Sequence, residues 1–139
     1  MVGLYKSTTT PAQKRTALRE SLQSDAITTL PGAFNPLSAR LIQDIGGFSG
    51  VYLSGAVLAN DLGLPDIGLT TLTEVVTRAG HVARATDLPV LVDADTGFGE
   101  PMSAARTIAE LESAGIAGCH LGDQVNPKRC GHLDGKEVV

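Results

Sequence analysis

The chain has 139 residues and a formal net charge of −4, and this length suits a single domain with a substantial core. Hydrophobic residues make up 42% of the sequence and charged residues 19%, a balance that is typical of globular proteins and excludes a disordered chain. The negative charge provides no basic surface for nucleic acid, and no apolar run approaches the roughly 20 residues that span a bilayer. Residues 1–6 lack the apolar core of a signal peptide. We therefore expect a cytoplasmic protein without nucleic-acid or membrane partners.

Helix and strand patterns alternate along the chain. Four helices are predicted, over residues 11–22, 36–45, 71–86 and 102–113. The third begins with Thr71-Leu-Thr-Glu74, which has capping-box spacing, and in the second Leu37, Leu41, Ile42 and Ile45 are predicted to line one face. Four short strands are predicted, over residues 26–30, 51–53, 89–92 and 117–121. Residues 54–69 are predicted to form a long loop.

Each predicted strand is followed by a helix, which indicates parallel neighbours. A (β/α)8 barrel needs eight such units in about 250 residues. The sequence therefore predicts an α/β fold of about four βα units, the first half of a TIM-type barrel, with one partial barrel domain over residues 1–139 and an N-terminal helical segment at 1–25. An open doubly wound sheet is the alternative, although no G-x-G-x-x-G motif follows the first strand.

The chain contains two cysteines, Cys119 and Cys130, whose separation of eleven residues matches no zinc-binding spacing. A disulfide between them is one alternative, but thiols in the cytoplasm stay reduced. We therefore expect both cysteines to be free.

Two aspartates, Asp93 and Asp95, follow the apolar run 90–92. Alternation along a strand predicts that both point to the same face, where two carboxylates repel each other unless a cation or a proton neutralises them. This pattern indicates a Mg²⁺ site that keeps several waters. Capping and turn chemistry ahead of Gly97 is the alternative.

Cys130 lies in a polar loop beside Lys128, Arg129 and His132. Cationic neighbours favour the thiolate form of a cysteine, as a reactive thiol requires. The alternative is that Cys130 is a small buried hydrophobic residue, the more common situation for a lone cysteine.

Three motifs, Leu64-Pro65-Asp66, Val92-Asp-Ala-Asp-Thr-Gly-Phe-Gly99 and Lys128-Arg-Cys-Gly-His132, together resemble the isocitrate lyase and phosphoenolpyruvate mutase superfamily. Within it the sequence is most similar to the methylisocitrate lyases, from about Leu30 to Val139. The resemblance implies Mg²⁺-dependent cleavage of the tricarboxylate 2-methylisocitrate to pyruvate and succinate, a reaction of the methylcitrate cycle of propionate catabolism. It also implies a homo-oligomer, although the oligomeric state of this chain is left open.

The same resemblance assigns roles to individual residues. It implies metal binding by Asp93, Asp95 and, through water, Asp66; catalytic roles for Cys130, Tyr52 and His132; and substrate contacts from Ser54, Gly55, Lys128, Arg129 and Gly131. Cys130 would protonate the succinate carbanion, Tyr52 is a candidate base, and His132 would orient the loop. For Tyr52, Ser54 and Gly55 the alternative is a turn at the end of a strand without a substrate role. For Asp66 and Lys128 the alternative is a solvated side chain in a loop. His81 and His120 are interpreted as structural.

The sequence departs from the family at Gly122, where the family has a glutamate of the metal shell followed by Asp-Gln. Residues that the family takes from later strands, among them an arginine and a glutamate that grip the substrate, are absent from the 139 residues. We therefore expect residues 1–139 alone to have no lyase activity. The alternatives are a truncated non-catalytic remnant, a fragment that binds a partner through open strand edges, or an isocitrate lyase-like or oxaloacetate decarboxylase-like enzyme.

Overall fold

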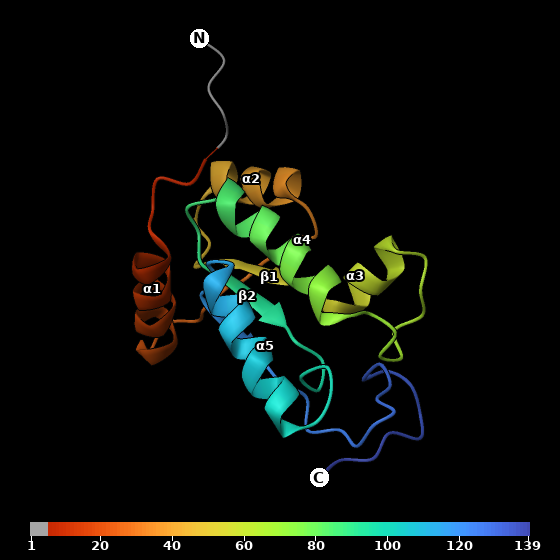
Figure 1. Cartoon of the computed structure of the whole chain (residues 1–139). Coiled ribbons are helices and arrows are strands. Elements are labelled where there is room, and N and C mark those ends of the chain that lie inside the picture. The colour runs from red at the N-terminus through yellow and green to blue at the C-terminus, as the bar shows by residue number, and fades with distance from the viewer. Residues whose placement is uncertain (1–5) are drawn as a thin grey trace.

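The computed structural model of the chain describes residues 6–139, in which helices alternate with short strands (Figure 1). The elements of this part are α1 (Pro11–Gln23), α2 (Pro36–Ile45), β1 (Val51–Leu53), α3 (Gly55–Asp61), α4 (Leu72–Ala85), β2 (Val90–Asp93), α5 (Pro101–Ser113) and β3 (Gly118–His120). No described helix has the length and apolar character to cross a membrane. The prediction that the chain has no signal peptide rests on residues 1–6. Of these, residues 1–5 lie outside the described residues.

Local capping chemistry explains where three of the four predicted helices begin. Capping boxes stand at the starts of α1, α2 and α4, formed by the pairs Thr10–Gln13, Asn35–Ser38 and Thr71–Glu74. In each pair the two side chains satisfy backbone N–H groups that the first turn of the helix leaves unpaired. The four predicted helices are therefore confirmed, with ends that shift by one residue.

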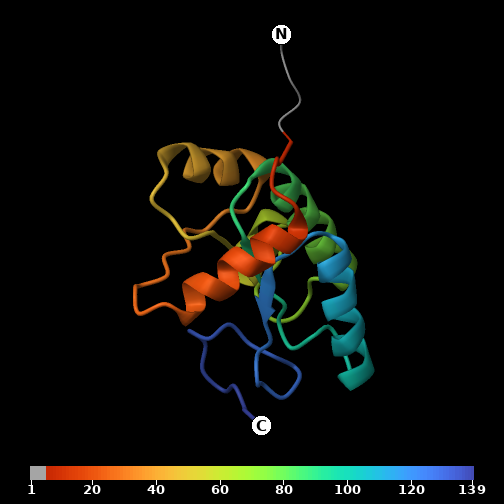
Figure 2. The same cartoon turned by 90° about the vertical axis from the view of Figure 1, so that its left-hand side faces the viewer.

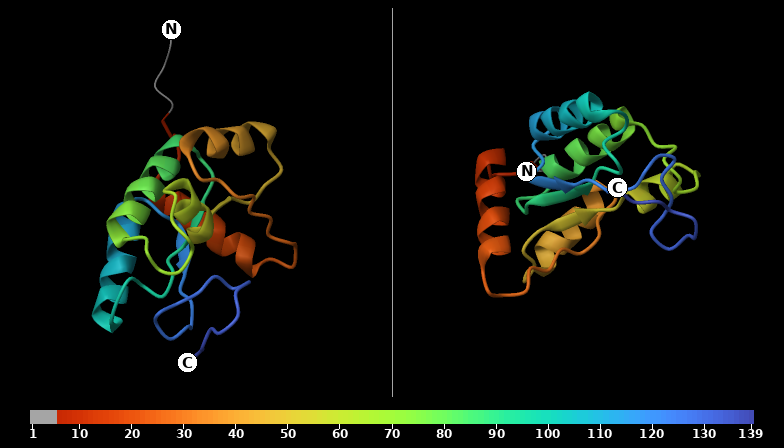
Figure 3. Two further views of the ribbon diagram at one scale, coloured as in Figure 1. Left: turned by 90° about the vertical axis from the view of Figure 1, so that its right-hand side faces the viewer. Right: turned by 90° about the horizontal axis from the view of Figure 1, so that it is seen from below.

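The strands form a parallel sheet in the order β1-β2-β3, in which Val51 pairs with Val90 and Asp93 with His120. Helices α2, α4 and α5 pack side by side along one face of this sheet (Figure 3). Val51, Leu53, Val90 and Val92 are fully buried beneath them, whereas Tyr52 and Leu91 point to the opposite face and stay half-exposed. Sequential parallel strands with helices on one face confirm the partial barrel and contradict the doubly wound alternative, which needs helices on both faces.

Two predictions about the early part of the chain are wrong. Residues 26–30 form no strand; the chain runs beside β1 only at a single parallel bridge between Gly32 and Tyr52, because Pro31 has no N–H to extend the ladder. Residues 54–69 are not one loop, because α3 forms within them. The Ser54 side chain caps this helix by accepting a hydrogen bond from Val57 N–H at 3.5 Å.

The apolar face predicted for α2 is also only partly correct. Ile42 is buried together with Ala39, but Leu37, Leu41 and Ile45 are exposed. The buried face of α2 thus consists of the small residue Ala39 and one large residue, Ile42. The number of apolar positions in the sequence therefore overestimates how much of the helix is buried.

Helix α1 closes the amino-terminal end of the sheet, as seen in Figure 2, where it lies in front of the strands. The ammonium of Lys14 is buried and donates to the backbone oxygens of Ala83 at 2.7 Å and Thr86 at 2.5 Å. Burial lowers the pKa of Lys14, against the opposing charge of Asp87. These bonds satisfy carbonyls that the carboxyl end of α4 leaves unpaired and place a cation at its negative dipole end.

Asp87 fixes the segment that leads into α1. Its carboxylate accepts hydrogen bonds from Ser7 Oγ at 2.9 Å, from Thr8 N–H at 2.6 Å and from Thr9 N–H at 3.0 Å. Burial alone would raise the pKa of Asp87, but these hydrogen bonds lower it to about 2. The folded state therefore holds this carboxyl in its charged form more strongly than the unfolded chain does.

We expect this anchor to weaken in acid. Because the pKa of Asp87 falls from 3.8 to about 2 on folding, its contribution is complete above the unfolded pKa and is lost as the pH drops through the folded one. Asp87→Asn should lower stability at neutral pH and flatten the loss between pH 4 and 2, measured by urea unfolding at a series of pH values. Asp25→Asn, at an exposed aspartate, is the control. Indistinguishable pH profiles for the two variants would contradict the role of Asp87.

Candidate active site

The carboxylate of Asp93 stands at the carboxyl end of β2, and backbone groups fix its orientation. Its Oδ2 accepts a hydrogen bond from Gly55 N–H at 3.1 Å, and its Oδ1 accepts one from Asp95 N–H at 3.1 Å. A Cβ atom on Gly55 would lie 2.9 Å from Asp93 Oδ2 and 3.4 Å from Asp95 Oδ1. The predicted pair of aspartates is thus brought together at the first residue of α3, and only a glycine fits there without displacing Asp93.

Asp95 reaches this site by a different route from the one predicted. The strand ends at Asp93, and Asp95 follows it in a left-handed conformation with φ 48°, so simple alternation does not orient its side chain. Its Oδ2 accepts a hydrogen bond from the Thr70 hydroxyl at 3.3 Å. Burial raises the pKa of Asp95, while the nearby Lys128 offsets part of this rise.

Lys128 pairs with two of the predicted metal-site residues. Its ammonium contacts Asp66 Oδ1 and lies 2.5 Å from Asp95 Oδ1, and only 7% of Lys128 is exposed. Burial lowers the pKa of Lys128, but the hydrogen bonds and charges of Asp66 and Asp95 outweigh burial, and the net pKa is raised. The alternative of a solvated Lys128 is therefore excluded.

Tyr52 and His120 form a pair on the open face of the sheet. The Tyr52 hydroxyl is 2.9 Å from His120 Nε2, and the two rings stack with centroids 5.7 Å apart. His120 Nδ1 lies 4.0 Å from Asp93 Oδ1. Burial, followed by the charge of Asp93, raises the pKa of Tyr52 to about 12. His120, interpreted from the sequence as structural, therefore lies beside the candidate site; its position opposite Asp93 in a parallel sheet was the signal that could have indicated this.

The loop around Cys130 is held against Asp66 through its backbone. Cys130 N–H donates to Asp66 O at 3.1 Å, and Figure 1 shows this segment in dark blue on the same side as α3. Cys130 Sγ is 3.7 Å from His132 Nδ1. Arg129 instead donates to Asp134 O at 3.0 Å, and Lys128 turns to the aspartates. Of the three predicted cationic neighbours, the structure therefore places only His132 in contact with the thiol.

Both cysteines are free thiols, and we expect them to differ in reactivity. Burial raises the pKa of the Cys119 thiol, so this thiol ionises less readily. At neutral pH, Cys130 should be alkylated by iodoacetamide faster than Cys119. Measured separately in Cys119→Ser and Cys130→Ser, equal rates would contradict this expectation, and His132→Ala should slow the reaction of Cys130.

The arrangement of the acidic side chains determines which kind of metal site is compatible with this part of the molecule. Within residues 6–139, no group of three or more His, Cys, Asp or Glu side chains has an arrangement that would hold a metal. Asp93 and Asp95 nevertheless converge at Gly55, and Mg²⁺ is commonly bound by one or two carboxylates together with waters and substrate oxygens. The donor set therefore fits a two-carboxylate Mg²⁺ site.

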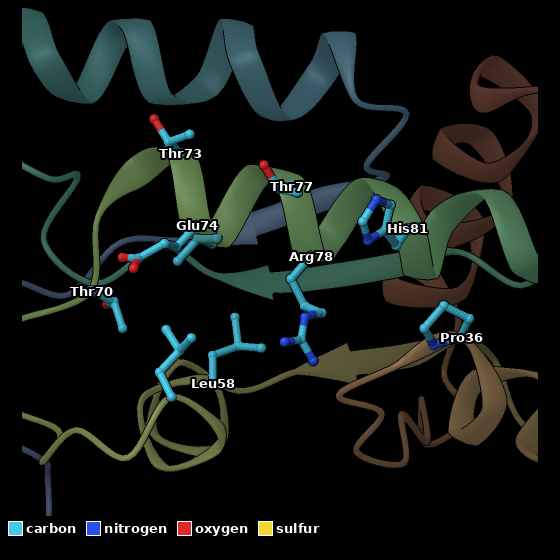
Figure 4. A pocket seen from close by; sticks show the side chains of 10 residues that line it. Pro36, Leu58, Thr70, Thr73, Glu74, Thr77, Arg78 and His81 are labelled. Atoms are coloured by element: carbon cyan, nitrogen blue, oxygen red, sulfur yellow. The ribbon is translucent and has the colours of Figure 1, made fainter.

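Two hollows of similar size lie in different regions of the molecule. One of about 460 Å³ is on the helical face, where Figure 4 shows Glu74, Arg78 and His81 along α4 and Leu58 on α3. Its charged groups already have structural partners, since Arg78 pairs with Asp61 at 2.7 Å and Glu74 closes a capping box. The other, of about 490 Å³, lies among the loops that follow the strands and includes Asp95 and Lys128. Only the second coincides with the candidate site.

Comparisons with known proteins show the family to which the chain belongs. The family model described as phosphoenolpyruvate phosphomutase matches residues 18–138. A probable 2-methylisocitrate lyase 2 of Corynebacterium glutamicum is 70% identical over 139 residues, which are 100% of this chain and 45% of that protein. A 2,3-dimethylmalate lyase of Eubacterium barkeri is 45% identical over 88% of this chain and 42% of its own length.

Solved structures give the same relationship. An oxaloacetate acetylhydrolase in complex with 3,3-difluorooxalacetate superposes with a TM-score of 0.81 and 38% identity, covering 94% of this chain and 44% of that one. The chain thus spans less than half the length of these relatives.

Proposed function

This chain belongs to the phosphoenolpyruvate phosphomutase family, and on that premise we propose that it forms the aspartate- and cysteine-bearing part of a carbon–carbon lyase that cleaves 2-methylisocitrate to pyruvate and succinate. The observation that carries the proposal is the 70% identity, over all 139 residues, with a probable 2-methylisocitrate lyase. The convergence of Asp93 and Asp95 at the strand ends supports it.

In this proposal Asp93 and Asp95 hold Mg²⁺, and Asp66 contributes through a water molecule. When bound there, Mg²⁺ would supply Lewis acidity to the oxygens of the substrate. The backbone N–H groups of Gly55 and Asp95 keep the Asp93 carboxylate oriented before any ligand arrives, and this preorganisation removes part of the cost of ordering the site.

The proton transfers are assigned to Tyr52, His120 and Cys130. The substrate hydroxyl loses its proton, the C–C bond breaks, and the bonding electrons pass to the succinate fragment, whose carbanion takes the proton of the Cys130 thiol. With a pKa of about 12, Tyr52 is protonated at neutral pH. It can accept the substrate proton only as its own proton passes to His120 Nε2, 2.9 Å away.

Substrate carboxylates are assigned to Ser54, Arg129 and Gly131, with Gly55 shaping the wall beside the aspartates. The Ser54 side chain is half-exposed at the carboxyl end of β1, beside Tyr52 in a small hollow of about 100 Å³. Lys128 is the exception among the predicted substrate contacts, because its ammonium is engaged by Asp66 and Asp95. We also propose a cytoplasmic location, which the two free thiols support.

The test joins residues 1–139 to the complementary remainder of the C. glutamicum relative, which is 70% identical over the shared part. This completed enzyme is expected to release pyruvate from 2-methylisocitrate in the presence of Mg²⁺, detected with a coupled lactate dehydrogenase assay. Isocitrate, 2,3-dimethylmalate and oxaloacetate are assayed in parallel. Preferred cleavage of one of them would replace the proposed substrate, and no turnover of any would favour a non-catalytic, partner-binding role.

The 139 residues alone are expected to release no pyruvate above background. They cover 45% of a relative's length, so more than half of the residues of such an enzyme are not present in them. The same assay on purified residues 1–139, with the completed enzyme as positive control, measures this. Mg²⁺-dependent release of pyruvate by the short chain would contradict the expectation.

A further inference from the structure

We propose that Lys128 is an internal counter-cation that occupies the acidic site in the absence of metal and is displaced when a divalent cation binds. This inference rests on the proposed function, because it concerns the same aspartates. It differs from the substrate-binding role predicted for Lys128.

The contacts of Lys128 support a site for a cation rather than a surface ion pair. Its ammonium bridges carboxylates from two distant segments, Asp66 after α3 and Asp95 after β2. Lys128 and Asp95 are 7% and 8% exposed, so solvent screens their interaction little. A third carboxylate, Asp93, lies beside Asp95 at Gly55. Without Lys128, three neighbouring carboxylates would repel one another and at least one would tend to take up a proton.

The ammonium and a divalent cation compete for the same oxygens. Asp95 Oδ2 already accepts from Thr70 and Asp95 Oδ1 contacts Lys128, so coordination by Asp95 requires its Oδ1 to exchange one cation for the other. Two cations on one carboxylate would also repel each other in a poorly screened site. Metal binding and the Lys128 ion pairs are therefore mutually exclusive at Asp95.

Displacement of Lys128 would be transmitted to the catalytic cysteine. Lys128 is two residues before Cys130, and the Cys130 N–H donates to Asp66 O at 3.1 Å. The Lys128 ammonium and the Cys130 N–H thus tie this loop to Asp66 and Asp95, while Arg129 ties it to Gln124 through two hydrogen bonds. Release of the ammonium removes the side-chain tie to the aspartates, so that metal occupancy would control how firmly the Cys130 loop is held against Asp66.

Calorimetric titration of Mg²⁺ and Mn²⁺ into the purified chain tests the competition. Lys128→Met is expected to bind both ions about tenfold more tightly than the unaltered chain, within the range seen for groups around a metal site. Lys136→Met is the matched control: it removes the same charge from the same loop, but Lys136 contacts only the Gly131 carbonyl, at 2.7 Å. Its affinity should be unchanged. Circular dichroism verifies that each variant is folded.

A second measurement needs no variant. In the unaltered chain the alkylation rate of Cys130 should rise with Mg²⁺ and saturate at the dissociation constant found by calorimetry, whereas the rate of Cys119 should not. Equal or weaker binding by Lys128→Met, or a Cys130 rate that does not respond to bound Mg²⁺, would overturn the inference and leave the metal site intact. If neither Mg²⁺ nor Mn²⁺ binds to any folded variant, the metal site of the proposed function is overturned. The displacement of Lys128 is then overturned as well.

Discussion

Replacing Cys130 with alanine is expected to lower the turnover of the completed enzyme by about 10²–10⁴-fold, the usual contribution of a positioned general acid. The reason is that the carbanion left by C–C cleavage then has only water as a proton source. The Michaelis constant should change much less, because the thiol acts after the bond breaks. Steady-state assays of pyruvate release from 2-methylisocitrate measure both quantities.

The matched control is Cys119→Ala, which removes the other thiol, one that packs against the hydrophobic core and has no role in the proposed mechanism. It should keep most of the turnover. If Cys130→Ala also kept most of its turnover, the proton would have to come from another group, and the pair of Tyr52 and His120, joined at 2.9 Å, would be the next candidate.

The elements that sequence predicted well are those whose signal is local. Thr71 and Glu74 cap one another three residues apart, so the start of α4 is encoded within four residues. The continuous apolar run that ends at Val92 predicts a strand covered on both faces; Val92, on the side of the helices, is inaccessible to solvent, whereas Leu91 on the opposite face is half-exposed. Asp93 is the last residue of this strand, and the candidate site therefore lies at the expected end of the sheet.

The parts that escaped prediction depend on contacts between distant segments. The Lys128 ion pair with Asp66 joins residues 62 positions apart, and nothing in a loop lysine indicates such a partner. His120 acquires its place beside Tyr52 only through the register of β3 on β2. Helix α3 is short, and its one capping residue, Ser54, directly follows a strand. The sequence at this position therefore did not indicate that a helix begins here. Its existence depends on packing of Leu58 in the core.

Gly122 is the position where a single substitution should change metal binding most clearly. Its N–H donates to Asp95 O at 2.6 Å, so the backbone here lies directly against the segment of the proposed metal site. A Cβ added to Gly122 would lie 3.4 Å from Asp95 O and 3.9 Å from Thr96 Cγ2, which is ordinary contact. A side chain therefore fits at this position without displacing the backbone around it.

Gly122→Glu in the completed enzyme is expected to tighten Mg²⁺ binding by at least about tenfold, because it adds a carboxylate to the shell of the metal. Calorimetric titration with Gly and with Glu at position 122 measures the effect, and Ile27→Glu, at a position that is 91% exposed, controls for the added charge. In residues 1–139 alone the same substitution should rescue no turnover, since more than half of a relative's length is still absent. Equal Mg²⁺ affinities would show that glycine is tolerated at position 122 and that water or Asp123 replaces the missing carboxylate.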